Sequence, residues 1–242
     1  MMRPMGIHEW WERGERVAIA LRGADRHVWM RRLGAGPSLT LLHGFPSSSY
    51  DWARVVPELA ERHELQLVDL LGFGASDKPA DHEYSLYEQA DLVEAIWSRA
   101  GITSTAVLAH DYSVTVAQEL LARRAEGELS VELLAVHLLN GGVYPDLHRP
   151  VATQTALLDP EQGPRIAAAM TEELFAQTLR PTFGPGHDIA RDSADIWQAI
   201  ARGGVVLHRL IRFMPERAAN ADRWVGALED TDVPLSFVWG ML

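Results

Sequence analysis

The first 140 residues alternate short apolar runs with amphipathic stretches. Two of the runs, Arg16–Leu21 and His27–Arg32, flank the turn-prone residues Gly23-Ala24-Asp25 and predict a hairpin of two strands. Further runs rich in leucine or β-branched residues predict buried strands at Ser38–Leu42, Leu65–Leu70, Thr105–Ala109 and Leu133–Leu139.

The stretches between these runs have the spacing of helices. Asp51–Arg62 and Val114–Arg124 are amphipathic, and a third helix is predicted from Ser85 to about Ala100. Ser85 and Glu88 fit a capping box, in which a serine caps the helix and a glutamate follows three residues later. Strands and helices that alternate with such short connections predict an α/β fold, with a mostly parallel sheet and helices on both faces.

The pattern changes after Asn140. From about residue 143 to 230, helical stretches are separated by proline and glycine, and strand character resumes at Val233–Trp239. A helical block between two strands of one sheet is typical of an inserted lid. We therefore predict a core formed by residues 1–142 and 231–242, with a helical lid at 143–230.

Composition and charge remove several classes of function. Lys and Arg number 22 against 33 Asp and Glu, a net charge of −11 that repels nucleic-acid phosphates. The chain has no cysteine, which excludes disulfides, zinc-thiolate sites and cysteine nucleophiles. No apolar run reaches the roughly 18 residues of a membrane span, so a cytoplasmic location is the default expectation. The His and Asp residues show no metal-ligand spacing, and no cofactor is predicted.

The motif His43-Gly44-Phe45-Pro46 follows a predicted strand. Glycine permits a tight turn there, and the backbone N–H of Phe45 is then directed to the sheet edge where open α/β sheets bind ligands. The alternative is a structural turn with no active role.

A second motif, VLAHDYSVTVAQELL, has the strand, sharp turn and helix of a nucleophile elbow. Small residues are required two positions before and two after the nucleophile. Centring the turn on Asp111 places Ala109 and Ser113 there, whereas centring it on Ser113 fits less well. Asp111 is therefore the predicted nucleophile, and the backbone N–H groups of Phe45 and Tyr112 are the predicted oxyanion donors. The alternative role for Asp111 is a helix N-cap.

These motifs, together with LGFGASDKP (Leu71 to Pro79), resemble the α/β-hydrolase superfamily, in the branch of epoxide hydrolases and haloalkane dehalogenases. SSYDW, YSLYEQA, LNGGVYPDLHRP and RWVGAL are similar to segments of mesoderm-specific transcript proteins and their bacterial relatives. The resemblance implies an eight-stranded sheet with a lid after the sixth strand and Asp111 as nucleophile. A dinucleotide-binding loop at Gly72-Phe73-Gly74 is the weaker alternative, because its third glycine is absent.

The resemblance also implies an acid after the next strand and a late histidine. The sequence departs here, because it ends at Leu242 and no histidine follows His208. We therefore expect the last strand–helix units to be missing, with both partners beyond Leu242. His43 and His110 belong to structural positions of the family, and the side chain of His110 is expected to point into the sheet packing. Asn140 stands where some dehalogenases place their acid, but it cannot carry the charge.

The predicted activity is hydrolysis through an alkyl-enzyme ester on a small or medium apolar substrate of the epoxide or haloalkane class. Tyr144 is the only tyrosine after Asn140, so ring opening by a tyrosine pair is not favoured. Trp197 and Trp224 are candidates for lining a lid pocket. The alternative is a non-catalytic or truncated hydrolase-like protein that binds a ligand or a partner. The sequence gives no oligomeric state.

Overall fold

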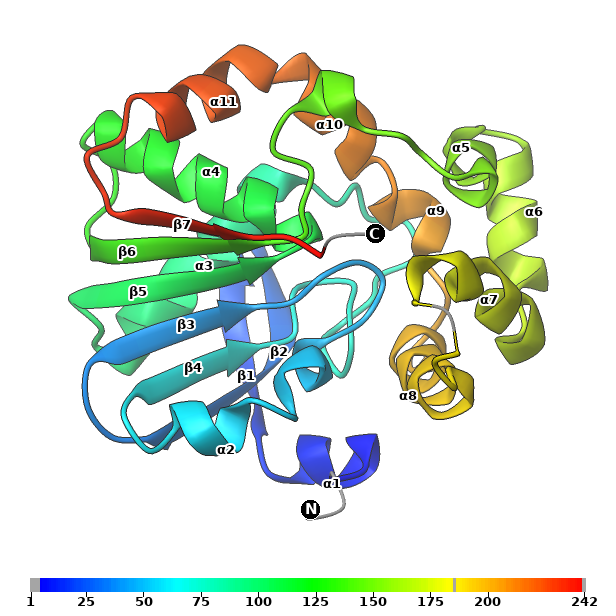
Figure 1. The fold of residues 1–242 in the computed structure, drawn as a ribbon, viewed down its shortest axis with the longest axis horizontal. Helices are drawn as coiled ribbons and strands as arrows, with labels where there is room; N and C mark the ends of the chain where they lie inside the picture. Colours follow the sequence, from blue (N-terminus) through cyan, green and yellow to red (C-terminus); the bar gives the residue numbers. More distant parts are fainter. Residues whose placement is uncertain (1–4, 185, 241–242) are drawn as a thin grey trace.

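The computed structural model describes residues 5–184 and 186–240, so parts of the predicted core segments, residues 1–4 and 241–242, lie outside it. Seven strands form one sheet in the order β1-β2-β4-β3-β5-β6-β7 (Figure 1). Their bounds are β1 Glu15–Leu21, β2 Ala24–Gly34, β3 Ser38–Leu42, β4 Glu64–Val68, β5 Ser104–His110, β6 Glu132–Leu139 and β7 Leu235–Val238. From β4 to β7 the neighbouring strands are parallel, which confirms the predicted mostly parallel sheet.

The first two strands form the predicted hairpin, but its turn lies one residue earlier than expected. Arg22 and Gly23 form the turn with positive φ angles of 47° and 83°, and Ala24 already pairs with Leu21. Two residues with positive φ match the right-handed twist of the flanking strands. Asp25 therefore belongs to β2 and not to the turn.

Helices cover both faces of the sheet. The larger apolar cluster includes residues of α3 (Leu86–Ala100), α4 (Tyr112–Ala125) and α11 (Ala221–Glu229). On the opposite face, α1 (Ile7–Glu12) and α2 (Val56–Leu59) contribute to a second cluster rich in tryptophan. The central strands are buried by both layers, which explains why their sequences read as continuous apolar runs.

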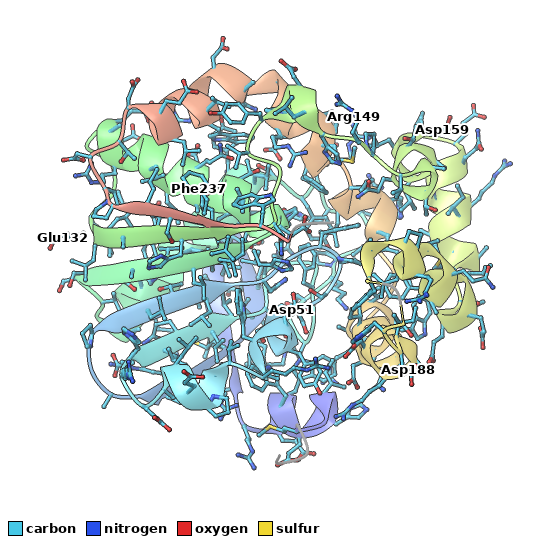
Figure 2. All side chains as sticks on the ribbon, in the orientation of Figure 1. Asp51, Glu132, Arg149, Asp159, Asp188 and Phe237 are labelled. Atoms are coloured by element: carbon cyan, nitrogen blue, oxygen red, sulfur yellow. The ribbon has the colours of Figure 1, made fainter. Side chains whose placement is uncertain are left out.

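The described residues between β6 and β7 form helices and short turns without a strand, as the sequence predicted. Figures 1 and 2 show most of these helices beyond the carboxyl ends of the parallel strands, with Asp159 and Asp188 among them and Glu132 at the amino ends. The helices are α5 Ala152–Leu158, α6 Gln162–Ala169, α7 Glu172–Leu179, α8 Ala190–Ala201, α9 Leu207–Leu210, α10 Phe213–Ala219 and α11. Helix α11 packs on α4 and covers the sheet, although the predicted lid range included it. The division into core and lid stays a prediction.

A buried lysine joins the core to this helical block. Lys78, the single lysine of the chain, extends from the loop after β4 toward the carboxyl end of α8. Its ammonium group donates hydrogen bonds to the carbonyl oxygens of Ala199 at 2.5 Å and Arg202 at 2.6 Å. An ammonium group at a helix carboxyl end satisfies carbonyls that have no partner within the helix.

The predicted helix over Asp51–Arg62 is wrong. The structure has a 3-10 turn at Ser49–Trp52 and a single helical turn, α2, instead. Pro57 has no N–H to donate to a carbonyl of the preceding turn, so a helix that begins at Asp51 cannot continue through it.

The predicted capping box is correct in one half only. Ser85 caps α3 by accepting a hydrogen bond from the N–H of Tyr87 at 3.1 Å. Glu88 instead pairs with His82, at 2.6 Å. The carboxylate of Glu216 in α10 accepts from the Leu86 N–H at 2.8 Å, so a distant segment supplies the second partner of this helix start.

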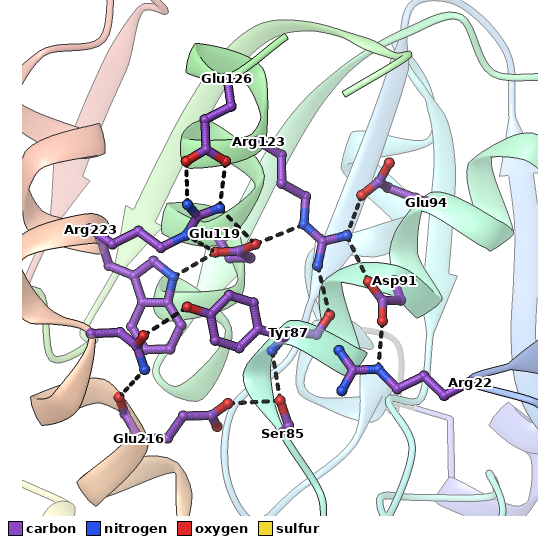
Figure 3. Close-up of polar contacts among 12 residues, drawn as sticks. Arg22, Ser85, Tyr87, Asp91, Glu94, Glu119, Arg123, Glu126, Glu216 and Arg223 are labelled. Carbon is purple, nitrogen blue, oxygen red and sulfur yellow. Dashed lines mark hydrogen bonds and ion pairs between the residues drawn. The ribbon is translucent and has the colours of Figure 1, made fainter. Parts of the chain in front are cut away.

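Helix α11 is held on α4 by a buried carboxylate (Figure 3). Glu119 is 1% exposed and accepts hydrogen bonds from Arg123 Nε at 2.8 Å, Arg223 Nε at 2.8 Å and Trp224 Nε1 at 2.7 Å. Burial opposes the charged form of Glu119, but these donors prevail and lower its pKa. The cluster joins α3, α4 and α11 into one layer.

We expect Glu119→Gln to lower the free energy of unfolding at pH 7 by about 2 kcal/mol, because charge-assisted bonds are lost in a buried place. The folded state holds the Glu119 pKa below its unfolded value. The contribution is therefore full above the unfolded value and is lost as pH falls through the folded one. Denaturant unfolding at a series of pH values measures both effects.

Glu94→Gln is the matched control, since Glu94 contacts the same Arg123 guanidinium at 2.6 Å from the edge of the cluster. Its loss should cost less than about 1 kcal/mol. Equal losses in the two variants, or an unchanged acid dependence in Glu119→Gln, would show that Glu119 does not organise the cluster.

Among the described residues, no helix has the length and apolar character needed to cross a membrane.

Candidate active site

The predicted site residues meet at the carboxyl ends of three neighbouring parallel strands. Phe45 follows β3, Asp111 follows β5 and Asn140 follows β6, and β5 pairs with both of the other strands. The N–H of Asp111 donates to the carbonyl oxygen of Leu139 at 2.9 Å, which ties the end of β5 to the end of β6. Sheet pairing therefore brings together residues that lie far apart in the sequence.

Asp111 occupies the turn between β5 and α4 in a strained backbone conformation. Its φ and ψ are 49° and −109°, a combination that side-chain-bearing residues seldom adopt. Strain of this kind costs about 1–3 kcal/mol and persists where the surrounding structure enforces it. The side chain of Asp111 is partly exposed and lines a cavity.

Ser113 has the opposite environment. It is 0% exposed, and its hydroxyl donates a hydrogen bond of 2.5 Å to the carbonyl oxygen of His43. This hydroxyl is engaged inside the protein and is absent from the cavity lining. The arrangement fits Ser113 as a small spacer and Asp111 as the residue presented to a ligand.

The loop after β3 approaches the Asp111 carboxylate with its backbone. The Phe45 N–H donates to Oδ2 of Asp111 at 2.9 Å, and the Phe45–Pro46 peptide bond is cis. A Cβ atom at Gly44 would lie 2.9 Å from both the Cβ of Asp111 and Nδ1 of His110. Gly44 is thus the residue type that allows this close approach, as the motif predicted.

Opposing effects act on the pKa of Asp111, and the effect of burial is the largest. Burial raises the pKa of Asp111 above its ordinary value. The charge of His110, the N–H groups of Phe45 and Tyr112, and the charge of Arg217 act in the other direction. The carboxylate is consequently less well solvated than an ordinary surface aspartate, and a desolvated anion is a better nucleophile.

His43 is fully buried beneath the site. Its Nδ1 donates to the carbonyl oxygen of Gly44 at 2.8 Å, and its Nε2 accepts from the N–H of Leu70 at 3.1 Å. A ring with one donating and one accepting nitrogen is neutral. Burial lowers the pKa of His43, in agreement with this assignment. His43 supports the two loops and has no nitrogen left for proton transfer.

His110 does not point into the sheet packing, so that expectation is wrong. Its side chain is 34% exposed, and Nδ1 lies 3.6 Å from the carboxylate of Asp51. Burial opposes the charged form, but Asp51, with Asp111 nearby, raises the pKa of His110. Together with Asp51, the side chain of His110 lines a second cavity of about 300 Å³.

A cavity of about 540 Å³ opens at Asp111. Its apolar lining comes from the loop after β6, from α10 and α11, and from β7 with the residue that follows it. The lining includes Val143, Leu147, Phe213, Leu228, Phe237 and Trp239. Asn140 and Tyr144 also line it, with the amide oxygen of Asn140 accepting from the Gly240 N–H at 2.8 Å and the Tyr144 hydroxyl donating to Glu229 at 3.0 Å.

Two polar lining residues were not predicted as site residues. Arg217 of α10 and His148 of the loop after β6 are in contact at the cavity wall, where Arg217 donates to Nδ1 of His148. Nothing in the sequence distinguishes Arg217 from the other 20 arginines. Its position depends on how α10 packs, which a local pattern does not contain.

The predicted lid tryptophans have other roles. Trp224 is 1% exposed and bonds to Glu119, and Trp197 packs against Phe175 at 6.1 Å between ring centroids. Trp239, directly after β7, is the tryptophan that lines the cavity. Among the residues the structure describes, no group of three or more His, Asp or Glu side chains is placed to hold a metal ion.

Comparison with known proteins assigns the family. Residues 37–178 match the alpha/beta hydrolase fold family, which is more than half of the chain. The chain belongs to the α/β-hydrolase family. This result confirms the resemblance seen in the motifs.

Relatives of this α/β hydrolase include the mesoderm-specific transcript homolog protein of Bos taurus, 39% identical over 87% of the chain. The chain spans 65% of the length of that relative. A hydrolase of Mycobacterium tuberculosis named LipZ is 36% identical over 99% of the chain and 83% of its own length. A haloalkane dehalogenase from Bradyrhizobium elkanii shares the fold, with a TM-score of 0.72, 22% identity, and coverage of 94% of this chain and 80% of that one.

We expect Asp111→Asn to stabilise this hydrolase at neutral pH by about 1 kcal/mol, roughly 2–4 °C in Tm. The folded state raises the Asp111 pKa, so wild-type stability falls as pH rises from the unfolded value through the folded one. Asparagine does not titrate. Its advantage should therefore be small in acid and complete above the raised pKa, as thermal unfolding against pH would show.

Asp69→Asn is the control, because Asp69 is buried but accepts bonds of 2.8 Å from the N–H groups of both Ser49 and Ala75. That variant should lose stability. A loss of Tm in Asp111→Asn at neutral pH would contradict the desolvation assigned to the Asp111 carboxylate.

Proposed function

We propose that this α/β hydrolase uses Asp111 as a nucleophile that forms an ester with a small or medium alkyl electrophile of the epoxide or haloalkane class. The observation that carries the proposal is the presentation of Asp111. Its carboxylate stands on a strained turn, accepts the Phe45 N–H at 2.9 Å and lines a cavity whose other walls are largely apolar.

The hydrogen bond assigns different tasks to the two carboxylate oxygens. Oδ2 is held by the Phe45 N–H, so Oδ1 is the oxygen available for attack on a carbon in the cavity. The new bond forms from Oδ1, and the carbon–halogen or carbon–oxygen bond breaks with its electron pair going to the leaving group. Oδ2 then becomes the ester carbonyl oxygen, next to the N–H donors that would stabilise the oxyanion of hydrolysis.

Hydrolysis of the ester needs a base that activates water. Within the described part of the chain, three histidines lie near Asp111, and each is engaged. His43 is buried and neutral, His110 faces Asp51, and Nδ1 of His148 accepts from Arg217. We therefore expect ester formation to be fast relative to ester hydrolysis in the 242-residue chain.

The engaged histidines also favour a second candidate, a hydrolase-like protein that binds a ligand without turnover. In that case the Asp111 carboxylate would take part in ligand binding but would not be alkylated. Covalent modification separates the two functions.

The test is intact-mass spectrometry of the 242-residue chain after incubation with a panel consisting of a primary bromoalkane, a terminal epoxide and bromoacetate. We expect one alkyl group to be added per chain by at least one reagent, with peptide mapping locating it on Asp111. Asp111→Asn should abolish the adduct, whereas Ser113→Ala should retain it.

Three results would overturn the proposal. They are an adduct that depends on Ser113 and not on Asp111, turnover without any adduct, and the absence of both adduct and turnover across the panel. The last result would support the binding function.

A further inference from the structure

We propose that the substrate of this site carries a carboxylate group, and that Arg217 binds this group while Asp111 attacks a nearby carbon. The inference rests on the proposed nucleophile and adds a substrate class to it. It starts from the charges of the cavity. Among the described residues that line it, Asp111 is the one carboxylate and Arg217 the one permanent cation.

Arg217 is unusually poor in partners for a buried arginine. It is 4% exposed, its Nε is buried without a hydrogen-bond partner, and no carboxylate of the described residues lies within 4.0 Å of its guanidinium. Arg123, by comparison, contacts three carboxylates, those of Asp91, Glu94 and Glu119. A buried cation without a partner is costly, so an anion that enters the cavity gains a strong interaction there.

The guanidinium is held in place by neutral groups. Arg217 donates to Nδ1 of His148, and its guanidinium carbon lies 5.5 Å from the centre of the Phe213 ring. At Gly142 a Cβ atom would come within 2.2 Å of a terminal nitrogen of Arg217, so the glycine leaves room for the guanidinium. These contacts fix the orientation and leave the positive charge unneutralised.

The preceding residue fixes the helix that carries Arg217. Glu216 points to the other side of α10, where it accepts from the Ser85 hydroxyl at 2.7 Å and the Leu86 N–H at 2.8 Å. This bond to the start of α3 anchors α10 to the core. Arg217 is thus directed to the cavity by a contact that has no connection with substrate.

Attraction between Arg217 and Asp111 does not account for the arginine. The two groups interact electrostatically, yet they form no direct ion pair. Both residues line the same cavity. The positive charge of Arg217 offsets the repulsion between a substrate carboxylate and the carboxylate of Asp111. With its carboxylate bound at Arg217, the substrate has an adjacent carbon positioned toward Oδ1 of Asp111. The planar guanidinium matches a carboxylate with two parallel hydrogen bonds.

The test compares two reagents of nearly equal shape, bromoacetate and bromoacetamide. With either one, Oδ1 of Asp111 bonds to the CH2 carbon and bromide leaves with the electron pair, so no proton or co-reactant is needed. Alkylation rates at Asp111 are followed by mass spectrometry and divided by the rates of the same reagents with acetate in solution. For the wild-type chain we expect this corrected rate, the enzyme rate divided by the acetate rate, to be at least about tenfold higher with bromoacetate than with bromoacetamide.

The variants assign the preference to Arg217. Arg217→Met should fold, because an apolar side chain of similar length replaces a buried charge, and its preference for bromoacetate should disappear. Arg217→Lys keeps the charge without the planar fork and should retain part of the preference. Arg149→Met is the control, since Arg149 is an exposed arginine beside His148 and its loss should leave the ratio unchanged.

The results separate this inference from the proposed function. Equal corrected rates in the wild-type chain, or a ratio that survives in Arg217→Met, would overturn the carboxylate assignment while leaving Asp111 as the nucleophile. An equal decrease of the Asp111 alkylation rate with both reagents in Arg217→Met would also overturn it, because Arg217 would then act only by stabilising the charged form of Asp111. Failure of both reagents to alkylate Asp111 would contradict the nucleophile itself.

Discussion

The site depends on the parallel pairing of β3 and β5. This pairing ends both strands at the same sheet edge, so the Phe45 N–H meets the Asp111 carboxylate at 2.9 Å. The turn at Asp111 has a φ of 49°, a conformation that is unfavourable by itself. The buried sheet and α4 enforce it, because they continue directly into the turn on either side. Without this constraint the aspartate would be an ordinary helix cap and its carboxylate would be solvated.

The helical layer supplies the second requirement, which is part of the wall of the cavity at Asp111. Glu119 holds α11 on α4, and Glu216 holds α10 at the start of α3. Both are carboxylates satisfied by donors from other segments, and neither lines the cavity. Arg217 differs from them, because its charge is buried without a carboxylate partner. Two carboxylates that join helices are thus paired with donors, whereas the guanidinium of Arg217 lines the cavity without a carboxylate partner among the described residues.

Local patterns in the sequence determine several elements of this fold and site. The strands, the hairpin and the elbow at Asp111 follow from apolar runs and from the small residues around the turn. The helix predicted from Asp51 failed because Pro57 interrupts it, and the cap of α3 was half wrong because Glu216 comes from a distant helix. Arg217 could not be predicted, since an arginine acquires its role from burial and from missing partners, and both are properties of the folded chain.

The most direct test of the account is a crystal structure of the chain after reaction with bromoacetate. We predict an ester bond to Oδ1 of Asp111, with Oδ2 still within hydrogen-bond distance of the Phe45 N–H and the new carboxylate against the guanidinium of Arg217. An adduct on Ser113 or His110, or an Asp111 ester whose carbonyl oxygen has left the Phe45 N–H, would contradict it.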